Sequence, residues 1–97
     1  MLRITVNSDP GSTHFGVEGS LTQASAAELK RCWLDILHSI RLQHVIIVDL
    51  TDLANIDGPG KKVLLEMYRR GVKLIGSGVM TKAVIEEIAN TPPRKTH

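Results

Sequence analysis

The chain opens with a short segment in which apolar and polar residues alternate. Over residues 2–6 every second residue is aliphatic, a period of two that is typical of a strand with one face in water. Residues 9–12 (Asp-Pro-Gly-Ser) favour a turn, and residues 13–18 repeat the alternation until Gly19 ends it. The pattern therefore predicts a β-hairpin.

Helical periodicity follows the hairpin. Apolar residues recur at spacings of three and four and so fall on one face of a helix, namely Leu29, Trp33, Ile36, Leu37 and Ile40. Ser25 and Glu28 match a capping box, and Thr22 is a second candidate cap one turn earlier. We expect an amphipathic helix of about five turns that packs on the sheet.

Residues 45–48 are four consecutive β-branched residues, a run that is too short to span a membrane and apolar on both faces. Such a run is typical of a central strand covered on both sides. Polar side chains follow it, at Asp49, Thr51, Asp52, Asn55 and Asp57. Open α/β sheets place their ligand or partner surfaces at the carboxyl ends of strands, so any functional site is expected there.

A second helix is predicted over residues 59–70, with Gly58 as its cap and Pro59 in its first position. Its inner face is predicted to hold Val63, Leu64, Met67 and Tyr68. Gly71 ends this helix, and residues 72–75 form a short strand parallel to 45–50. After a loop at 76–78 that needs positive φ, Thr81 is predicted to cap a final short helix.

The predicted order is ββαβαβα, an α/β fold with a single mixed β-sheet of about four strands and helices packed on it. At 97 residues the chain fits one domain, placed at residues 1–90, with a flexible Pro-rich tail at 91–97. A net charge of +2 and three scattered aromatic residues argue against nucleic-acid binding. No apolar run is long enough for membrane insertion, and the single cysteine, Cys32, predicts a buried inert thiol and a cytoplasmic protein.

Several groups of residues that could carry chemistry have structural explanations. Asp49, Asp52 and Asp57 could hold a metal, but loop hydrogen bonding and capping explain them better. Residues 76–78 (Gly-Ser-Gly) lack the third glycine and the lysine of a phosphate loop. The four histidines show no ligand spacing and form no nucleophile arrangement with Cys32. No catalytic residue, metal or cofactor is therefore expected, and the chain is not predicted to be an enzyme.

Three blocks of sequence resemble the STAS domain family, which includes bacterial anti-sigma-factor antagonists, domains of sulfate transporters and small partners of lipid-transport ABC systems. They are residues 19–29 (GSLTQASAAEL), residues 45–60 (VIIVDLTDLANIDGPG) and a helix closed by Gly71 with the strand VKLIG after it. The resemblance runs over about residues 2–88 and implies a non-enzymatic, protein-docking α/β domain. Many members continue with another strand and a long last helix, so a sheet edge left open or covered by a partner is expected.

The resemblance also implies where a switch would lie. In signalling members the turn reads Asp-Ser-Ser-Gly or Asp-Thr-x-Gly, and a partner kinase phosphorylates a hydroxyl there. The matching residues here are Asp57, Gly58, Pro59 and Gly60. Neither Gly58 nor Pro59 has a hydroxyl, so no phosphorylation is expected at this turn. The nearest remaining hydroxyls are those of Thr51, Ser77 and Thr81.

The predicted partner-binding residues are Asp57, Gly58, Pro59, Gly60, Lys61, Arg69 and Arg70. The expected partner is a protein, either an anti-sigma factor or serine-kinase-like protein, or a transporter ATPase for which the chain would be a small STAS subunit. The cations of the second helix are also explained as a solvated face that complements the helix dipole. Binding of a nucleotide or lipid at the strand ends is a further alternative, and a homodimer is left open.

Overall fold

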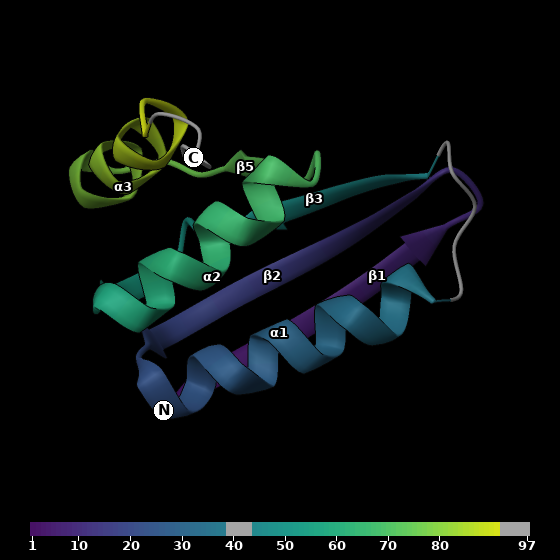
Figure 1. Ribbon diagram of the computed structural model, residues 1–97, viewed down its shortest axis with the longest axis horizontal. Coiled ribbons are helices and arrows are strands. Elements are labelled where there is room, and N and C mark those ends of the chain that lie inside the picture. The colour runs from purple at the N-terminus through teal and green to yellow at the C-terminus, as the bar shows by residue number, and fades with distance from the viewer. Residues whose placement is uncertain (39–43, 92–97) are drawn as a thin grey trace, which may run out of the picture.

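A five-stranded sheet with two helices laid across one of its faces makes up most of the molecule (Figure 1). The computed structural model describes residues 1–38 and 44–91. The elements are β1 (Leu2–Asp9), β2 (Ser12–Leu21), α1 (Gln23–Leu37), β3 (Val45–Asp49), β4 (Leu53–Ile56), α2 (Gly58–Arg69), β5 (Lys73–Ile75) and α3 (Val79–Ala89). The α/β class and the mixed sheet are confirmed, and the order is ββαββαβα because β4 is an additional strand.

The sheet is built around β2, the longest strand. β1 pairs with β2 in antiparallel register, with Leu2 opposite Gly19 and Asp9 opposite Ser12. On the other side of β2, β3 runs parallel to its first half and β4 runs parallel to its last residues. β5 then pairs in parallel with β3, so that β3 lies inside the sheet as predicted.

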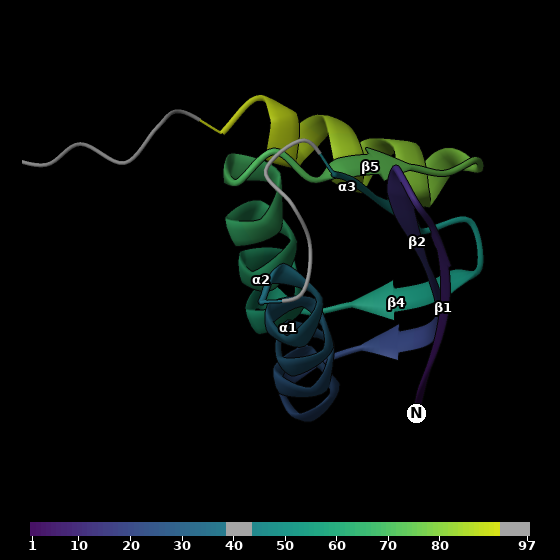
Figure 2. The same ribbon diagram turned by 90° about the vertical axis from the view of Figure 1, so that its right-hand side faces the viewer.

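Over residues 12–18 of β2 and along β3, buried side chains alternate with half-buried or exposed ones. In β2 the side chains of Thr13, Phe15 and Val17 are buried, and α1 and α2 lie over this face (Figure 2). In β3 Val48 is 0% exposed, whereas Val45, on the opposite face, is 39% exposed. The prediction that β3 is covered on both sides is wrong, because α1 and α2 pack on the same side of the sheet.

The start of α1 differs from the predicted capping box. Thr22 is the N-cap, and its backbone N–H donates a hydrogen bond to the Ser25 hydroxyl at 2.9 Å. Ser25 therefore lies within the first turn, so its predicted box with Glu28 is wrong and the second candidate cap is right. Cys32 is half-buried rather than fully buried. Ile40, assigned to the inner face, lies outside the described residues.

The other helix ends combine correct and incorrect predictions. α2 begins one residue earlier than predicted, with Asp57 rather than Gly58 as N-cap, and Tyr68 is 39% exposed instead of facing the core. Gly71 follows the helix with φ of +92°. α3 begins at Val79 after Gly78, whose φ is +100°, so Thr81 is not its cap.

None of the helices within residues 1–38 and 44–91 has the length and apolar character needed to cross a bilayer. Of the predicted tail at 91–97, only Thr91 is among the described residues. The tail and the domain boundary at residue 90 therefore remain predictions.

Candidate docking site at the start of α2

Asp57 joins the starts of two helices. Its Oδ1 accepts a hydrogen bond from the Gly60 backbone N–H at 2.9 Å, which caps α2. Its Oδ2 accepts from the backbone N–H of Gln23, the first residue of α1, at 3.0 Å. A carboxylate at the positive ends of two helix dipoles is stabilised by both. Both oxygens of Asp57 are thus engaged inside the chain, and its backbone position is fixed.

Gly60 is a packing residue. It is buried, and a Cβ atom added there would meet the backbone carbonyl oxygen of Leu21 and, at 2.9 Å, the Ile56 side chain. Only glycine lets the first turn of α2 come this close to the end of β2. The predicted role of Gly60 in partner binding is untested, but its burial gives it a structural role.

Gly58 and Pro59 form the outer part of the turn. Both are exposed, and a Cβ atom at Gly58 would have no neighbour within 4 Å. Pro59 has no N–H, and the first turn of a helix leaves that group without an intrahelical partner in any case. The turn therefore presents almost no side chain beyond the Pro59 ring, and a partner backbone could approach it closely.

Lys61 connects α2 to α3. Its Nζ lies 3.2 Å from Oε1 of Glu87, and the two side chains are 39% and 58% exposed. An ion pair this exposed contributes little to stability, on the order of 0 to 1 kcal/mol. It does show that the start of α2 and the exposed side of α3 are neighbours.

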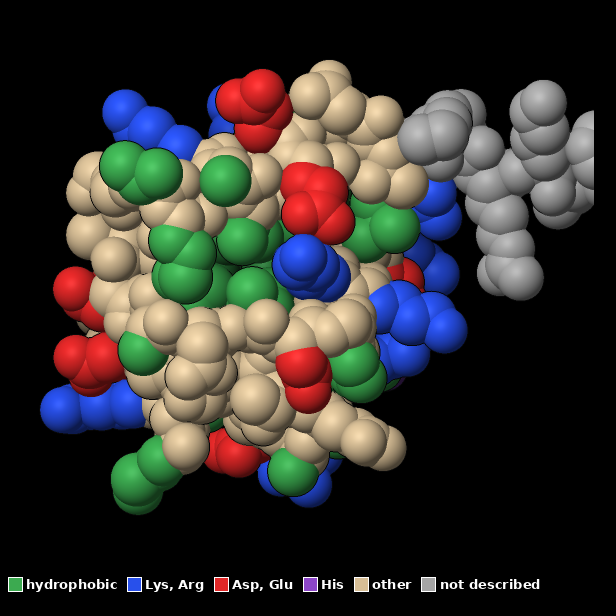
Figure 3. Space-filling model, turned by 90° about the vertical axis from the view of Figure 1, so that its left-hand side faces the viewer, with side chains coloured by type: hydrophobic (Ala, Val, Ile, Leu, Met, Phe, Trp, Pro, Cys, Tyr) green, Lys and Arg blue, Asp and Glu red, His purple; other side chains and the backbone are tan. Residues whose placement is uncertain are grey.

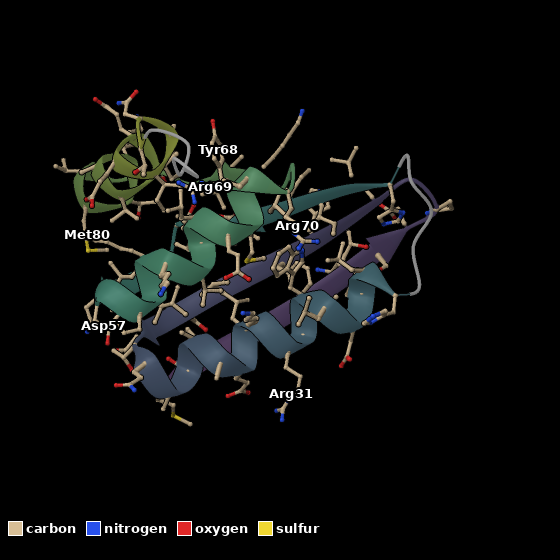
Figure 4. All side chains as sticks on the ribbon, in the orientation of Figure 1. Arg31, Asp57, Tyr68, Arg69, Arg70 and Met80 are labelled. Carbon is tan, nitrogen blue, oxygen red and sulfur yellow. The ribbon has the colours of Figure 1, made fainter. Side chains whose placement is uncertain are left out.

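Arg69 and Arg70 are far from the turn. They lie at the opposite end of α2 from Asp57, as Figure 4 shows. A helix of 12 residues spans about 18 Å, so one small contact could not include both ends. The structure thus gathers five of the seven predicted partner-binding residues at the turn and separates the two arginines from them.

Two exposed apolar residues at the start of α3 were missed by the prediction from sequence. Val79 is 90% and Met80 38% exposed, both in the first turn of α3. Figure 4 places Met80 at the same end of the molecule as Asp57, and Figure 3, which faces this end, shows hydrophobic side chains gathered near its middle. A signal was available, because two large apolar residues directly after Gly-Ser-Gly fit the inner face of no predicted element.

The hydroxyls nearest to the turn differ in accessibility. Thr81 is 3% exposed, and its hydroxyl donates to the Leu50 carbonyl oxygen at 3.0 Å. Thr51 is exposed, and its hydroxyl donates to Asp49 Oδ1 at 2.6 Å. Ser77 is exposed in the loop before α3. A kinase could therefore reach Thr51 or Ser77 in the folded chain but not Thr81.

Asp49, at the end of β3, accepts local hydrogen bonds from Thr51. The Thr51 hydroxyl, and after it the Thr51 backbone N–H, lowers the pKa of Asp49 below its ordinary value. Within residues 1–38 and 44–91, no three histidine, cysteine, aspartate or glutamate side chains lie close enough together to hold a metal ion.

Comparison with known proteins gives matches among solved structures. No family model matches the chain, and no curated protein sequence does. An anti-sigma factor antagonist from Mycobacterium paratuberculosis superposes with a TM-score of 0.76 at 16% identity, over 92% of this chain and 79% of that chain. An uncharacterised DUF3478 protein from Shewanella loihica, described as having a SpoIIAA-like fold, gives a TM-score of 0.61 at 19% identity, over 92% of this chain and 77% of that one.

A third match lies within a membrane protein. The murine anion transporter Slc26a9 superposes with a TM-score of 0.62 at 14% identity, over 84% of this chain and 14% of the transporter. At these identities the likeness concerns the fold. The resemblance predicted from the three sequence blocks is confirmed at that level: the chain has the SpoIIAA-like fold of anti-sigma factor antagonists and other STAS domains.

Proposed function

We propose that this chain is a non-enzymatic regulatory module that docks a partner protein through the surface around Asp57. We define the turn surface as Asp57, Gly58 and Pro59 together with Val79 and Met80. The observation that carries the proposal is the turn itself, which combines exposed Gly58 and Pro59 with an Asp57 backbone fixed by two helix starts. The fold is that of anti-sigma factor antagonists, which supports a docking role.

The composition of the turn surface suits protein binding better than chemistry. Val79 and Met80 offer apolar area, and Met adapts its shape to different partners. Both carboxylate oxygens of Asp57 are already bonded within the chain, so the residue orients the surface rather than reacting with a substrate. A rigid turn also lowers the entropy cost of association.

Docking of this kind would be regulated by occupancy rather than by modification of the turn. A phosphate at the start of a helix adds about two negative charges where a partner must be desolvated. Gly58 and Pro59 cannot carry one. The chain is expected to be bound or free according to the concentration of its partner. Mass analysis after incubation with the cognate kinase and ATP tests this, because phosphate on Thr51, the only hydroxyl within residues 49–60, would contradict it.

The variant Gly58→Glu tests the turn surface. Gly58 has open space around it, so the glutamate adds charge and bulk without disturbing the fold. Gly11→Glu is the matched control, because Gly11 also has no neighbour within 4 Å and lies in the β1–β2 turn at the other end of β2. We expect Gly58→Glu to weaken partner binding by about tenfold or more, which is about 1.4 kcal/mol, and Gly11→Glu to leave it unchanged.

The measurement is affinity purification on the immobilised chain, followed by titration of the retained protein against each variant. A partner lost only from Gly58→Glu supports the turn surface, and equal retention by all three chains rejects it. Copurification of an ATPase with its permease would identify a transport complex. A histidine-kinase-like anti-sigma factor would identify a transcription switch. The transport role has an observation of its own, since the same fold forms part of the Slc26a9 transporter.

A further inference from the structure

We propose that the C-terminal end of α2 carries a second docking surface, separate from the turn surface, which binds an acidic segment of polypeptide. We call this surface the basic groove and define it by Lys62, Leu65, Tyr68, Arg69, Arg70 and Lys73. It goes beyond the proposed function, because the turn surface lies at the other end of the helix and shares no residue with it.

The groove has a shape that can hold an extended segment. Two adjoining hollows share Leu65 and Arg69 as walls. One, of about 630 Å³, continues past Tyr68 to Lys73 on β5, and the other continues along α2 to Lys62 and Arg70. In Figure 4 the side chains of Tyr68, Arg69 and Arg70 project from the last turns of α2.

Cations greatly outnumber anions among the residues that line the groove. Lys62, Arg69, Arg70 and Lys73 contribute four cations, and Glu66 is the single anion among the lining residues. Glu66 is already paired within the chain, since its Oε2 lies 3.1 Å from the Nζ of Lys30 on α1. Even without Arg69, three cations face one carboxylate whose charge is balanced.

Helix stabilisation explains only part of this charge. Arg69 and Arg70 complement the negative end of the helix dipole, an effect confined to the last turn. Lys62 lies in the middle of α2, outside the last turn, and Lys73 lies on β5, so the dipole of α2 accounts for neither. Lys62, Leu65 and Arg69 recur at helical spacing, so they lie on one face of α2 from its middle to its last turn. The arrangement fits recognition of an anionic partner better than it fits a local dipole effect.

Two lining residues specify a polypeptide rather than a bare anion. Tyr68 is 39% exposed and Leu65 is half-buried, and both line the larger hollow together with Arg69 and Lys73. Tyrosine and arginine are the residue types enriched at energetic centres of protein interfaces. The matching occupant is a segment rich in aspartate or glutamate that carries one large apolar side chain.

The test uses a short fluorescein-labelled peptide in which one leucine is flanked by glutamates. The intact chain is added to this peptide at low ionic strength, and binding is measured by fluorescence anisotropy. The charge-reversed variant is Arg70→Glu with Lys73→Glu. The matched control is Arg31→Glu with Lys82→Glu, which gives the same net charge from exposed residues on α1 and α3. We expect the groove variant to lose about tenfold or more in affinity and the control less than about twofold.

Two further variants and two other anionic ligands, vesicles and DNA, also test the proposal. Lys62→Glu, a single exposed substitution in the middle of α2, replaces the double variant if circular dichroism shows that the latter is unfolded, and must also weaken binding. Tyr68→Ala must weaken binding of the leucine-containing peptide more than that of an all-glutamate peptide. The proposal would be overturned if the groove and control variants lost affinity equally, or if the acidic peptide did not bind. It would also be overturned if the chain preferred phosphatidylserine vesicles or a DNA oligonucleotide to the peptide.

Discussion

Asp49 and Asp57 each come directly after an apolar strand residue, yet their hydrogen bonds span different distances in the sequence. Asp49 accepts two hydrogen bonds from Thr51, two residues later in the chain, from the hydroxyl at 2.6 Å and the backbone N–H at 2.9 Å. Asp57 reaches Gln23, 34 residues earlier. The first pattern is local and follows from the sequence, since aspartate commonly bonds to the backbone two residues on. The second depends on tertiary structure and was not predicted.

Thr51→Val is predicted to change the acid stability of the chain through Asp49. The hydrogen bonds from Thr51 lower the pKa of Asp49, so they stabilise the folded state above the unfolded pKa of the carboxyl. This stabilisation is lost as the pH falls through the lowered pKa of the folded state. Valine removes the hydroxyl and keeps the shape, so the pKa of Asp49 should rise toward its ordinary value.

The check is a carboxyl carbon NMR titration of Asp49 in both chains, with urea unfolding at neutral pH and near pH 3. The free energy of unfolding should be lower for Thr51→Val at neutral pH, and the two chains should converge in acid. A difference that persists unchanged at low pH would assign the effect of Thr51 to something other than the Asp49 charge. Ser77→Ala, in an exposed loop without this partner, serves as the control.

At the scale of elements, the seating of α2 on the end of β2 decides where the turn surface lies. Gly60 permits the approach, because its missing side chain leaves room for the Leu21 carbonyl oxygen. The same oxygen accepts a hydrogen bond from the Asp57 backbone N–H at 3.2 Å. A helix start, a strand end and a capping carboxylate are thus locked together, and any shift of α2 would displace Gly58 and Pro59.

Gly60→Ala is predicted to destabilise the chain by about 1 to 3 kcal/mol, the usual cost of adding a methyl group to a packed site. Gly58→Ala, two residues away in open space, should be neutral or stabilising by about 0.4 to 1 kcal/mol, because alanine restricts the unfolded chain more than glycine does. Urea unfolding of the two variants measures both values. Equal stability of the two would mean that α2 is not seated on Leu21 as described.

The elements also show where sequence patterns stop being informative. β4 was missed because Leu53–Ile56 is a four-residue strand with two exposed polar or small residues, and it exists through its pairing with β2. Thr81 was assigned as a cap because threonine is common there. Its hydroxyl instead donates to the Leu50 carbonyl oxygen, 31 residues earlier, while Gly78 is the N-cap of the helix. Both errors concern partners distant in the sequence.

For the whole molecule, the pattern of residues predicted the main elements and their order along the chain. It did not predict the number of layers in which they pack. The hairpin, the parallel strands and both large helices were predicted, because each repeats a period of two or of three to four over several residues. The β-branched run at 45–48 indicated a strand buried on both faces. In the described structure only the face with Ile46 and Val48 is closed by helices, and Val45 is 39% exposed. Strand composition alone could not distinguish a two-layer from a three-layer fold.

Two identical substitutions in β3 test this one-sided architecture. Val48→Thr places a hydroxyl in a site that is 0% exposed, and an unpaired hydroxyl there should cost about 1 to 3 kcal/mol of unfolding free energy. Val45→Thr makes the same change on the open face, where surface substitutions usually stay within about 0.5 kcal/mol. Threonine keeps the β-branched shape, so strand preference is the same in both.

The measurement is urea unfolding of both variants at two protein concentrations, with sedimentation to report association. If Val45→Thr costs as much as Val48→Thr, a second layer covers the open face in solution. A cost that grows with protein concentration would identify that layer as another copy of the chain, since association stabilises the folded state by mass action. A concentration-independent difference between the two variants is the result that a two-layer monomer requires, because only one face of the sheet is then removed from water on folding.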